Sequence, residues 1–251
     1  MSVYAAWVLW WRGYPDQALR YIEQVLALAQ QCLHPFCQAF ALTFAVILHQ
    51  CRREAQVVST HVETSLALAH KYGFPLFVAM GEIFQNWALA EPMLGDESVE
   101  QIRAGITAYR ATGAELYRPY FLGLLAESYG RQGRTDKGLE ALTEALALVE
   151  TTGERLYEAE LYRLKGQLLL ARSLEDCIEA EACFQHALAI ARRQQARLLE
   201  LRTSVSLSRV WQQQGKRDQA RHMLGEVYGW FTEGFNTLDL VEAQALLDAL
   251  Q

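Results

Sequence analysis

A short phrase rich in leucine and alanine returns along this chain at intervals of about forty residues. VLALA at 25–29 is followed by SLALA at 65–69, ALALV at 145–149 and ALAIA at 187–191. A second phrase, T-G-x-x-L-Y, begins at Thr112 and again at Thr152. Self-similarity at a fixed period of this length is typical of repeat proteins, in which stacked helical units bury one continuous core.

Within each unit, small and large residues keep fixed places. We count in steps of forty from Gly13 and allow for a two-residue insertion near Leu174. Five places after each landmark stand residues that are all very small except Val58: Ala18, Val58, Ser98, Gly138, Ala180 and Ala220. Four places later all are large and apolar: Ile22, Val62, Ile102, Leu142, Phe184 and Leu224. Small residues let two helices approach closely, and large ones fill the space between pairs. This pattern therefore predicts that each unit consists of a first helix (helix A), a turn and a second helix (helix B).

The predicted fold is all-α, a right-handed α-α superhelix of about six helix pairs in a single domain over residues 1–251. The expected repeats are 1–33, 34–73, 74–113, 114–153, 154–195 and 196–235, and a capping helix follows over 236–251. In that helix, residues 240, 243, 247 and 250 are apolar, and the acids at 239, 242 and 248 predict one face in water. Glycines that suit left-handed helix ends are Gly73, Gly113, Gly153 and Gly234.

The order of positions in helix B, after a glycine turn, resembles the tetratricopeptide (TPR) family. In the fourth repeat the TPR signature positions hold Leu125, Ala126, Tyr129, Gly133, Gly138, Leu142 and Ala145. The standard TPR period is 34 residues, so the period of forty implies longer helices.

Longer phrases carry a closer resemblance. YAAWVLWWRGYPDQAL and SLSRVWQQQGKRDQARHMLGEVYGWFTEGF are similar to the C-terminal repeat region of large bacterial signalling ATPases of the adenylate/guanylate cyclase-like kind. The resemblance implies a regulatory, protein-interaction module. In that family an AAA-type ATPase domain, often with a cyclase-type domain before it, lies upstream and carries the catalytic parts, which this sequence lacks.

Composition and motifs give no support for an enzyme, a nucleic-acid-binding protein or a membrane protein. The net charge is −6 and basic residues occur only in short runs, so no basic surface is predicted. No G-x-x-x-x-G-K-[ST] loop appears, and no serine lies in a nucleophile elbow. We therefore expect a cytoplasmic protein with no catalytic residue, no cofactor and no metal.

The five cysteines are odd in number and lack the spacing of zinc fingers or redox motifs. We interpret them as reduced thiols in a cytosolic core. His49 lies near Cys32 and Cys37 in sequence, but it occupies the place held in other repeats by Leu9, Leu89, Tyr129, Leu169 and Trp211. It is interpreted as a packed core histidine rather than a metal ligand.

The TPR resemblance implies a partner site on the concave face, which helix A lines. The candidate partner-binding residues are Tyr120, Glu127, Arg131, Glu160, Arg163, Gln167, Arg202, Arg209 and Gln213. In the second and third repeats the same places hold Phe40, Thr43, Ile47, Met80, Ile83 and Trp87. Two alternatives remain open for the N-terminal half of the concave face: an apolar groove, or an apolar surface closed by the longer helices. The expected partner is another protein segment, for instance from the upstream ATPase.

The chain opens with a nine-residue apolar run, Val3–Trp11, that holds three tryptophans. Nothing basic precedes the run, and it is too short to span a bilayer, so neither an export signal nor a membrane helix fits. The run is apolar around its whole circumference, whereas an end helix should have one polar face. We therefore predict an exposed apolar edge at Trp7, Trp10 and Trp11, covered by an upstream domain or by a second copy in a homodimer.

Three functions remain open. The favoured one is a non-catalytic interaction and regulatory scaffold, as the C-terminal module of a larger cyclase/ATPase-type signalling protein. The alternatives are a stand-alone TPR adaptor and a small-molecule sensor with a pocket in the superhelix.

Overall fold

The computed structural model describes residues 2–89 and 95–251. In these residues the chain forms thirteen α-helices and no strand, so the all-α prediction is confirmed. The helices are α1 (Val3–Trp11), α2 (Pro15–Gln31), α3 (Pro35–Cys51), α4 (Ala55–Tyr72), α5 (Pro75–Leu89), α6 (Gly95–Ala111), α7 (Arg118–Arg131), α8 (Thr135–Thr152), α9 (Glu158–Arg172), α10 (Cys177–Gln194), α11 (Arg197–Gln213), α12 (Arg217–Tyr228) and α13 (Leu238–Ala249).

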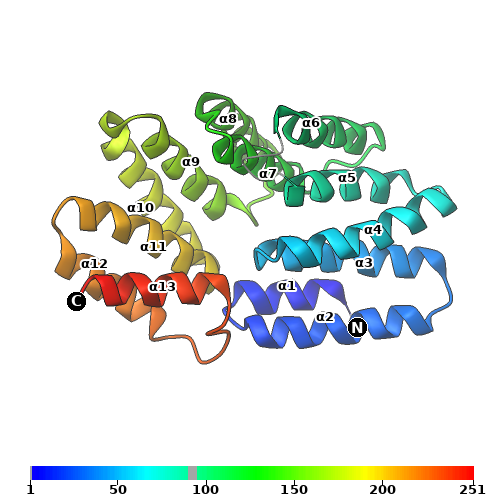
Figure 1. Ribbon diagram of the computed structural model, residues 1–251, viewed down its shortest axis with the longest axis horizontal. Coiled ribbons are helices and arrows are strands. Elements are labelled where there is room, and N and C mark those ends of the chain that lie inside the picture. The colour runs from blue at the N-terminus through cyan, green and yellow to red at the C-terminus, as the bar shows by residue number, and fades with distance from the viewer. Residues whose placement is uncertain (1, 90–94) are drawn as a thin grey trace.

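Consecutive helices pack in pairs that follow one another along a curved array (Figure 1). Each expected repeat range contains one pair, from α1 and α2 to α11 and α12. The two extra residues of the fifth repeat fall in a 3-10 turn, Leu174–Asp176, between α9 and α10. The repeat period in the sequence therefore gives the order of helices and turns directly.

Two local features of the sequence explain where helices begin and end. Pro15 stands at the start of α2, where its fixed φ suits the first turn and no backbone N–H is needed. Gly73 ends α4 at φ 69° and Gly153 ends α8 at φ 74°, conformations that cost most residues strain. Gly113 and Gly234 also have positive φ, but Gly234 lies in the loop between α12 and α13 rather than at a helix end, so the prediction is wrong for that glycine.

The core follows the small and large positions of the repeat. All six large residues at the predicted place, Ile22, Val62, Ile102, Leu142, Phe184 and Leu224, are at most 1% exposed. Close approach between helices is clearest at Gly166 in α9, where an added Cβ would lie 2.6 Å from Phe184 Cε1 and 3.0 Å from the Ala180 carbonyl oxygen. The small residues therefore set how closely the helices of a repeat pack.

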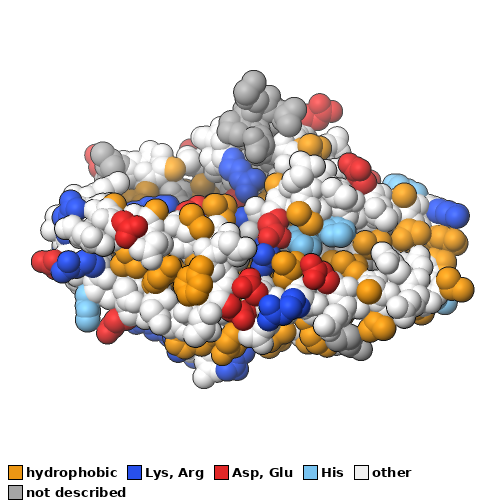
Figure 2. Space-filling model, turned by 60° about the horizontal axis from the view of Figure 1, so that its bottom comes forward, with side chains coloured by type: hydrophobic (Ala, Val, Ile, Leu, Met, Phe, Trp, Pro, Cys, Tyr) orange, Lys and Arg blue, Asp and Glu red, His pale blue; other side chains and the backbone are white. Residues whose placement is uncertain are grey.

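The array curves until its two ends meet. In Figure 1 the two ends of the array lie near each other, and α1 packs against α11. One Glu233 oxygen accepts the backbone N–H groups of Asp16 (3.0 Å) and Gln17 (2.9 Å) at the start of α2. In return, the N–H of Gly234 donates to Asp16 Oδ2 at 3.0 Å. On the face shown in Figure 2, acidic and basic side chains gather near the middle of the molecule.

This closure corrects the prediction for the opening run. Trp7 and Trp10 are buried, at 4% and 2% exposure, and Trp11 is half-buried. Trp7 Nε1 donates to the Phe44 carbonyl oxygen at 3.0 Å, and the Arg202 guanidinium lies 5.0 Å from the Trp10 ring centroid. The predicted exposed edge at these tryptophans is wrong, because α3 and the C-terminal half of the same chain cover them. They are therefore not available to a second copy or to an upstream domain.

On α1 itself the exposed apolar side chains are Tyr4 (45%) and Val8 (53%), and others lie at the turn between α2 and α3. Leu28, Leu33 and Phe36 are 47%, 91% and 45% exposed there. Cys32 and Cys37 are exposed at the same turn, so the prediction that all cysteines lie in the core is wrong for these two.

The apolar concave positions of the second and third repeats are closed by packing. Thr43, Ile47, Met80, Ile83 and Trp87 are at most 3% exposed, and Phe40 is half-buried with its ring stacked 4.4 Å from that of Phe44. In the second and third repeats the apolar surface is therefore closed by packing, and no apolar groove is present among these residues. Among the described helices, none is long and apolar enough to cross a bilayer.

Candidate partner-binding cavity

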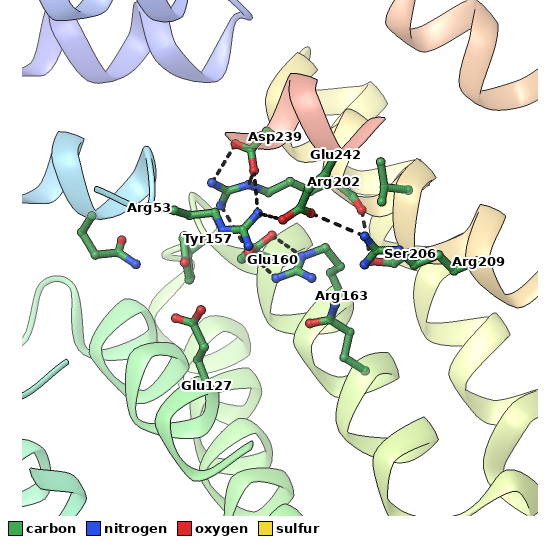
Figure 3. Close-up of a pocket in the computed structure, with 13 residues that line it drawn as sticks. Arg53, Glu127, Tyr157, Glu160, Arg163, Arg202, Ser206, Arg209, Asp239 and Glu242 are labelled. Atoms are coloured by element: carbon green, nitrogen blue, oxygen red, sulfur yellow. Dashed lines mark hydrogen bonds and ion pairs between the residues drawn. The ribbon is translucent and has the colours of Figure 1, made fainter. Parts of the chain in front are cut away.

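A polar cavity of about 160 Å³ lies in the centre of the curved array, where α7, α9, α11 and α13 converge with the end of α3 (Figure 3). Its walls carry four arginines and four carboxylates. The lining residues are Gln50, Arg53, Glu127, Tyr157, Glu160, Arg163, Gln167, Arg202, Val205, Ser206, Arg209, Asp239 and Glu242. The cavity opens to solvent on the side of Arg53 and Arg209, whose side chains are 37% and 51% exposed.

Six of the nine candidate residues predicted from the sequence line this cavity: Glu127, Glu160, Arg163, Gln167, Arg202 and Arg209. They lie on α7, α9 and α11, the A helices of the last three repeats. Recurrence at helical spacing brings these side chains to one side of each helix. The phase of the repeat therefore locates the centre of the array.

The other three candidates lie elsewhere, and their placement is a correction. Tyr120 is buried in the core, and its hydroxyl donates to Gln50 Oε1 at 2.7 Å. Arg131 packs over the Trp87 ring at 5.0 Å and donates to Glu127 Oε1 at 2.9 Å, outside the cavity lining. Gln213 is exposed at the last residue of α11, beyond the cavity.

Glu160 is the buried centre of charge. Arg163 donates to it through Nε at 2.8 Å and Nη2 at 2.6 Å, and Arg202 Nη1 lies at 3.4 Å. Burial raises the pKa of this carboxyl, but the two guanidinium groups outweigh burial and lower it to about 2. Glu160 is therefore ionised at neutral pH.

Arg202 joins four parts of the chain. It makes a two-bond pair with Asp239 of α13, at 3.0 Å to Oδ1 and 2.9 Å to Oδ2, and it donates to the Cys51 carbonyl at the end of α3. Burial lowers the pKa of the guanidinium, but Asp239 and Glu160 more than offset this and raise it above its usual value. Such bidentate, charge-assisted hydrogen bonds are stronger than hydrogen bonds between neutral groups.

Asp239 corrects the expected water-facing side of the capping helix. It is 6% exposed and faces the cavity, although its place in the sequence predicted contact with water. The apolar residues Leu240, Ala243 and Leu250 are buried as expected. The sequence of one helix could not reveal that Arg202, 37 positions away, neutralises this carboxylate.

Arg53 is the lining residue that the sequence could have signalled. It has φ 63°, and it stands at the repeat position that Gly13, Gly133 and Gly215 occupy, also at positive φ. An arginine that adopts positive φ where other repeats have glycine carries backbone strain, which indicates that its side chain makes contacts the fold needs. That side chain contacts Glu242 Oε1 at 2.9 Å and Asp239 Oδ1 at 3.5 Å, and it ties the α3–α4 turn to α13.

In the described residues no group of three or more His, Cys, Asp and Glu side chains could hold a metal ion. His49 is buried, and its Nδ1 lies 2.6 Å from Glu54 Oε2, so its interpretation as a packed core residue is confirmed. The charged groups of the cavity face one another as ion pairs, and none is placed to activate a nucleophile.

Known structures share this arrangement of helices. A Rap protein, in its crystal structure complexed with Competence and Sporulation Factor, matches over 96% of this chain and 70% of its own, with a TM-score of 0.69 and 17% identity. The TPR-like repeats of a putative kinesin light chain from Podosopora anserina match over 78% of this chain and 96% of their own, with a TM-score of 0.52 and 18% identity. The array is a TPR-like solenoid. At these identities the likeness shows the fold alone.

Sequence comparison adds one relative of the TPR-like chain. No family model matches the sequence. An uncharacterized protein of Rhizobium meliloti (strain 1021) is 24% identical over 200 residues, which cover 79% of this chain. The chain spans only 19% of the length of that relative.

Proposed function

We propose that this TPR-like array is a non-catalytic scaffold that binds a segment of a partner protein at its central cavity. The observation that carries the proposal is the convergence of Glu127, Glu160, Arg163, Gln167, Arg202 and Arg209 on one cavity. The Rap structure supports it, because an array of similar curvature was crystallised there in complex with a factor.

We further propose that the array is the regulatory C-terminal module of a larger cytoplasmic signalling protein of the cyclase/ATPase type. The phrase-level resemblance supports this, and so does the Rhizobium meliloti relative, of which the matching region is a small part. The coding frame upstream of Met1 tests the proposal. An AAA-type domain with a P-loop in that frame supports the module, whereas a stop codon directly upstream favours a stand-alone adaptor.

Site-specific crosslinking tests the scaffold function. A photoreactive amino acid is placed at Gln167, which lines the cavity, and in a matched control at Gln213, which is exposed outside it. In cells that encode the protein, we expect one partner to crosslink at 167 and not at 213, and the crosslink to weaken in the Arg209→Glu variant. The same proteins crosslinked at both positions, or none at 167, would contradict the proposal.

A further inference from the structure

We infer that Cys32 and Cys37 form a peroxide-sensitive dithiol, which closes reversibly into a disulfide and fixes the turn between the first and second repeats. Neither cysteine lines the central cavity, so the pair is independent of the partner site proposed there. The reaction is the oxidation of two thiols by a hydroperoxide, a co-reactant that comes from outside the protein.

The turn between α2 and α3 brings the two cysteines together, although their spacing in the sequence matches no redox motif. Cys32 is the C-cap of α2, and Cys37 lies in the first turn of α3. The N–H of His34 donates to the Cys32 carbonyl oxygen at 2.6 Å, which makes the turn tight. Gln38, next to Cys37, donates from Nε2 to the same oxygen at 3.5 Å. The start of α3 therefore folds back against the residue that ends α2.

The two thiols are accessible and close to each other. Both are exposed, and both line one open groove together with Leu28, Phe36 and Phe40. A hydrogen bond with the Cys32 side chain is the main cause that raises the pKa of the Cys37 thiol. Such a bond brings the two sulfur atoms near each other, as a disulfide also requires. A small reagent can therefore reach the sulfurs, and they need little movement to join.

The other three cysteines differ from this pair. Cys51 and Cys183 are buried, and burial raises the pKa of both thiols. Cys177 is half-buried, and its sulfur accepts the side-chain amide of Gln214 at 3.6 Å. Exposure and a neighbouring thiol are the two properties that suit a cysteine to reversible oxidation. Cys32 and Cys37 combine them.

The oxidation takes two steps and one equivalent of hydroperoxide. We assign the first step to Cys32, because the raised pKa of Cys37 keeps the proton on that thiol. The Cys32 thiol loses its proton to water, and its sulfur attacks one oxygen of the hydroperoxide. The O–O bond breaks, the leaving oxygen takes up a proton as an alcohol or water, and Cys32 becomes a sulfenic acid.

The second step closes the disulfide. The Cys37 sulfur attacks the Cys32 sulfur, the S–O bond breaks, and the hydroxyl leaves as water with the Cys37 proton. Each sulfur has then lost one electron, and the hydroperoxide has taken up both. An external thiol reverses the change by thiol–disulfide exchange, which makes the pair a reversible redox site.

The disulfide joins helix B of the first repeat to helix A of the second, because its two ends belong to α2 and α3. The entropic effect of a cross-link grows with the length of the loop that it closes, and this loop holds only residues 32–37. We therefore expect a local effect on the joint between the two repeats, namely slower opening of the last turn of α2 and the first turn of α3.

Peptide mapping of the full chain after treatment with hydrogen peroxide tests the reaction. We expect a disulfide between Cys32 and Cys37 of the same chain, with a mass loss of about 2 Da that dithiothreitol reverses. Dimedone, which traps sulfenic acids, should label Cys32 at least about tenfold more in the Cys37→Ser variant than in the wild type, because no neighbouring thiol then captures the intermediate. Cys177 is the internal control, and its labelling should be the same in both proteins.

Hydrogen exchange measured by mass spectrometry tests the effect on the joint. Peptides over residues 28–38 should exchange at least about threefold more slowly in the oxidised chain than in the reduced chain, whereas those of α10 should not change. The matched control is the double variant Cys32→Ser and Cys37→Ser, in which peroxide should change neither region. Both positions are exposed, so the serines should leave the fold intact.

Four outcomes overturn the inference: a pair that stays reduced in excess hydrogen peroxide, a disulfide that joins two chains, equal dimedone labelling of Cys32 in the wild type and in Cys37→Ser, or unchanged exchange over residues 28–38 after oxidation. Crosslinking at Gln167 is a separate measurement, so the scaffold function stands or falls independently of this pair.

Discussion

Glu160 keeps a negative charge in the interior because two guanidinium groups face it. Only 4% of its side chain is exposed, and each of its oxygens receives at least one N–H group from Arg163 or Arg202. A buried charge is tolerated only when it is paired and hydrogen-bonded in this way. The sequence suggested that these three side chains lie near one another, but it could not show that they neutralise each other.

This pairing predicts how stability depends on pH. The folded-state pKa of Glu160, about 2, lies below the ordinary glutamate value of 4.5. The stabilisation is therefore fully present above about pH 4.5 and is lost as the pH falls toward 2, a difference of about 3 kcal/mol. We expect Glu160→Gln to lower the free energy of unfolding by about 3–5 kcal/mol at pH 7, and by progressively less below pH 4.

Urea denaturation of both proteins between pH 7 and pH 3 measures this dependence. The matched control is Glu150→Gln, because Glu150 pairs with Arg155 on the surface with a side chain 66% exposed. It should leave the pH dependence as in the wild type. A constant difference between wild type and Glu160→Gln across this range would show that Glu160 is not the titrating group.

The cysteines should differ sharply in reactivity. Cys32 is exposed, whereas Cys51 is 4% exposed and burial raises the pKa of its thiol to about 12. Because the thiolate is the reactive form, iodoacetamide should modify Cys32 in the native protein and Cys51 only after unfolding. Peptide mass spectrometry over a time course reads both sites. Equal rates at the two cysteines would contradict the burial of the α3 end.

At the scale of helices, the contact between α9 and α10 is set by the absence of a side chain at Gly166. An alanine Cβ there would meet Phe184 and the Ala180 carbonyl oxygen at 2.6 and 3.0 Å. We expect Gly166→Ala to lower the free energy of unfolding by about 1–3 kcal/mol, since backbone cannot yield as a flexible side chain can. Thermal and urea denaturation measure the change.

Gly225 in α12 is the matched control for that substitution. An added Cβ would have only Leu247 near it, at 4.0 Å. In the interior of a helix, alanine is favoured over glycine by up to about 1 kcal/mol, so Gly225→Ala should stabilise the protein. The same change therefore has opposite signs at two helical glycines. If both variants were destabilised equally, close packing at Gly166 would not be the cause.

Helices and their pairing could be predicted from the sequence because both depend on local spacing. Phe184 and Leu142 recur at the same place in the repeat and are buried as that place requires. The same spacing brought Gln167 and Arg209 to one cavity. The prediction from spacing was wrong for Tyr120, which is buried in the core. The angle between successive helix pairs decides which concave residues reach the cavity, and no single repeat encodes that angle.

The closure of the whole array could not be predicted in this way. Curvature sums small rotations over six pairs, and the contacts that result join residues more than 200 positions apart, such as Asp16 and Gly234. The prediction of exposure is therefore wrong for Trp7, which packs against Phe44 of α3, and for Trp10, which lies under Arg202 of α11. An apolar helix indicates that it has neighbours on all sides, but it does not indicate which segment supplies them.

Glu233 should hold the two ends together. Its carboxylate accepts two N–H groups in the first turn of α2, where a negative charge also favours the helix dipole. We expect Glu233→Ala to lower the free energy of unfolding by about 1–2 kcal/mol, as the loss of a helix cap does. It should also speed hydrogen exchange at Asp16 and Gln17, measured by mass spectrometry. Glu226→Ala, at an exposed glutamate of α12, is the control and should change neither.

The meeting of the two ends also changes how the molecule should come apart. An open solenoid frays from its terminal repeats, because each of these has a neighbour on one side only. Here the first repeat rests on the sixth, so neither is an outermost unit from which unravelling can begin. The closing contacts span 216 to 218 positions of sequence, so we expect them to form after the pairs between them. Removal of either terminal repeat should therefore cost far more than one repeat's share of stability, and unfolding should be cooperative across the entire chain.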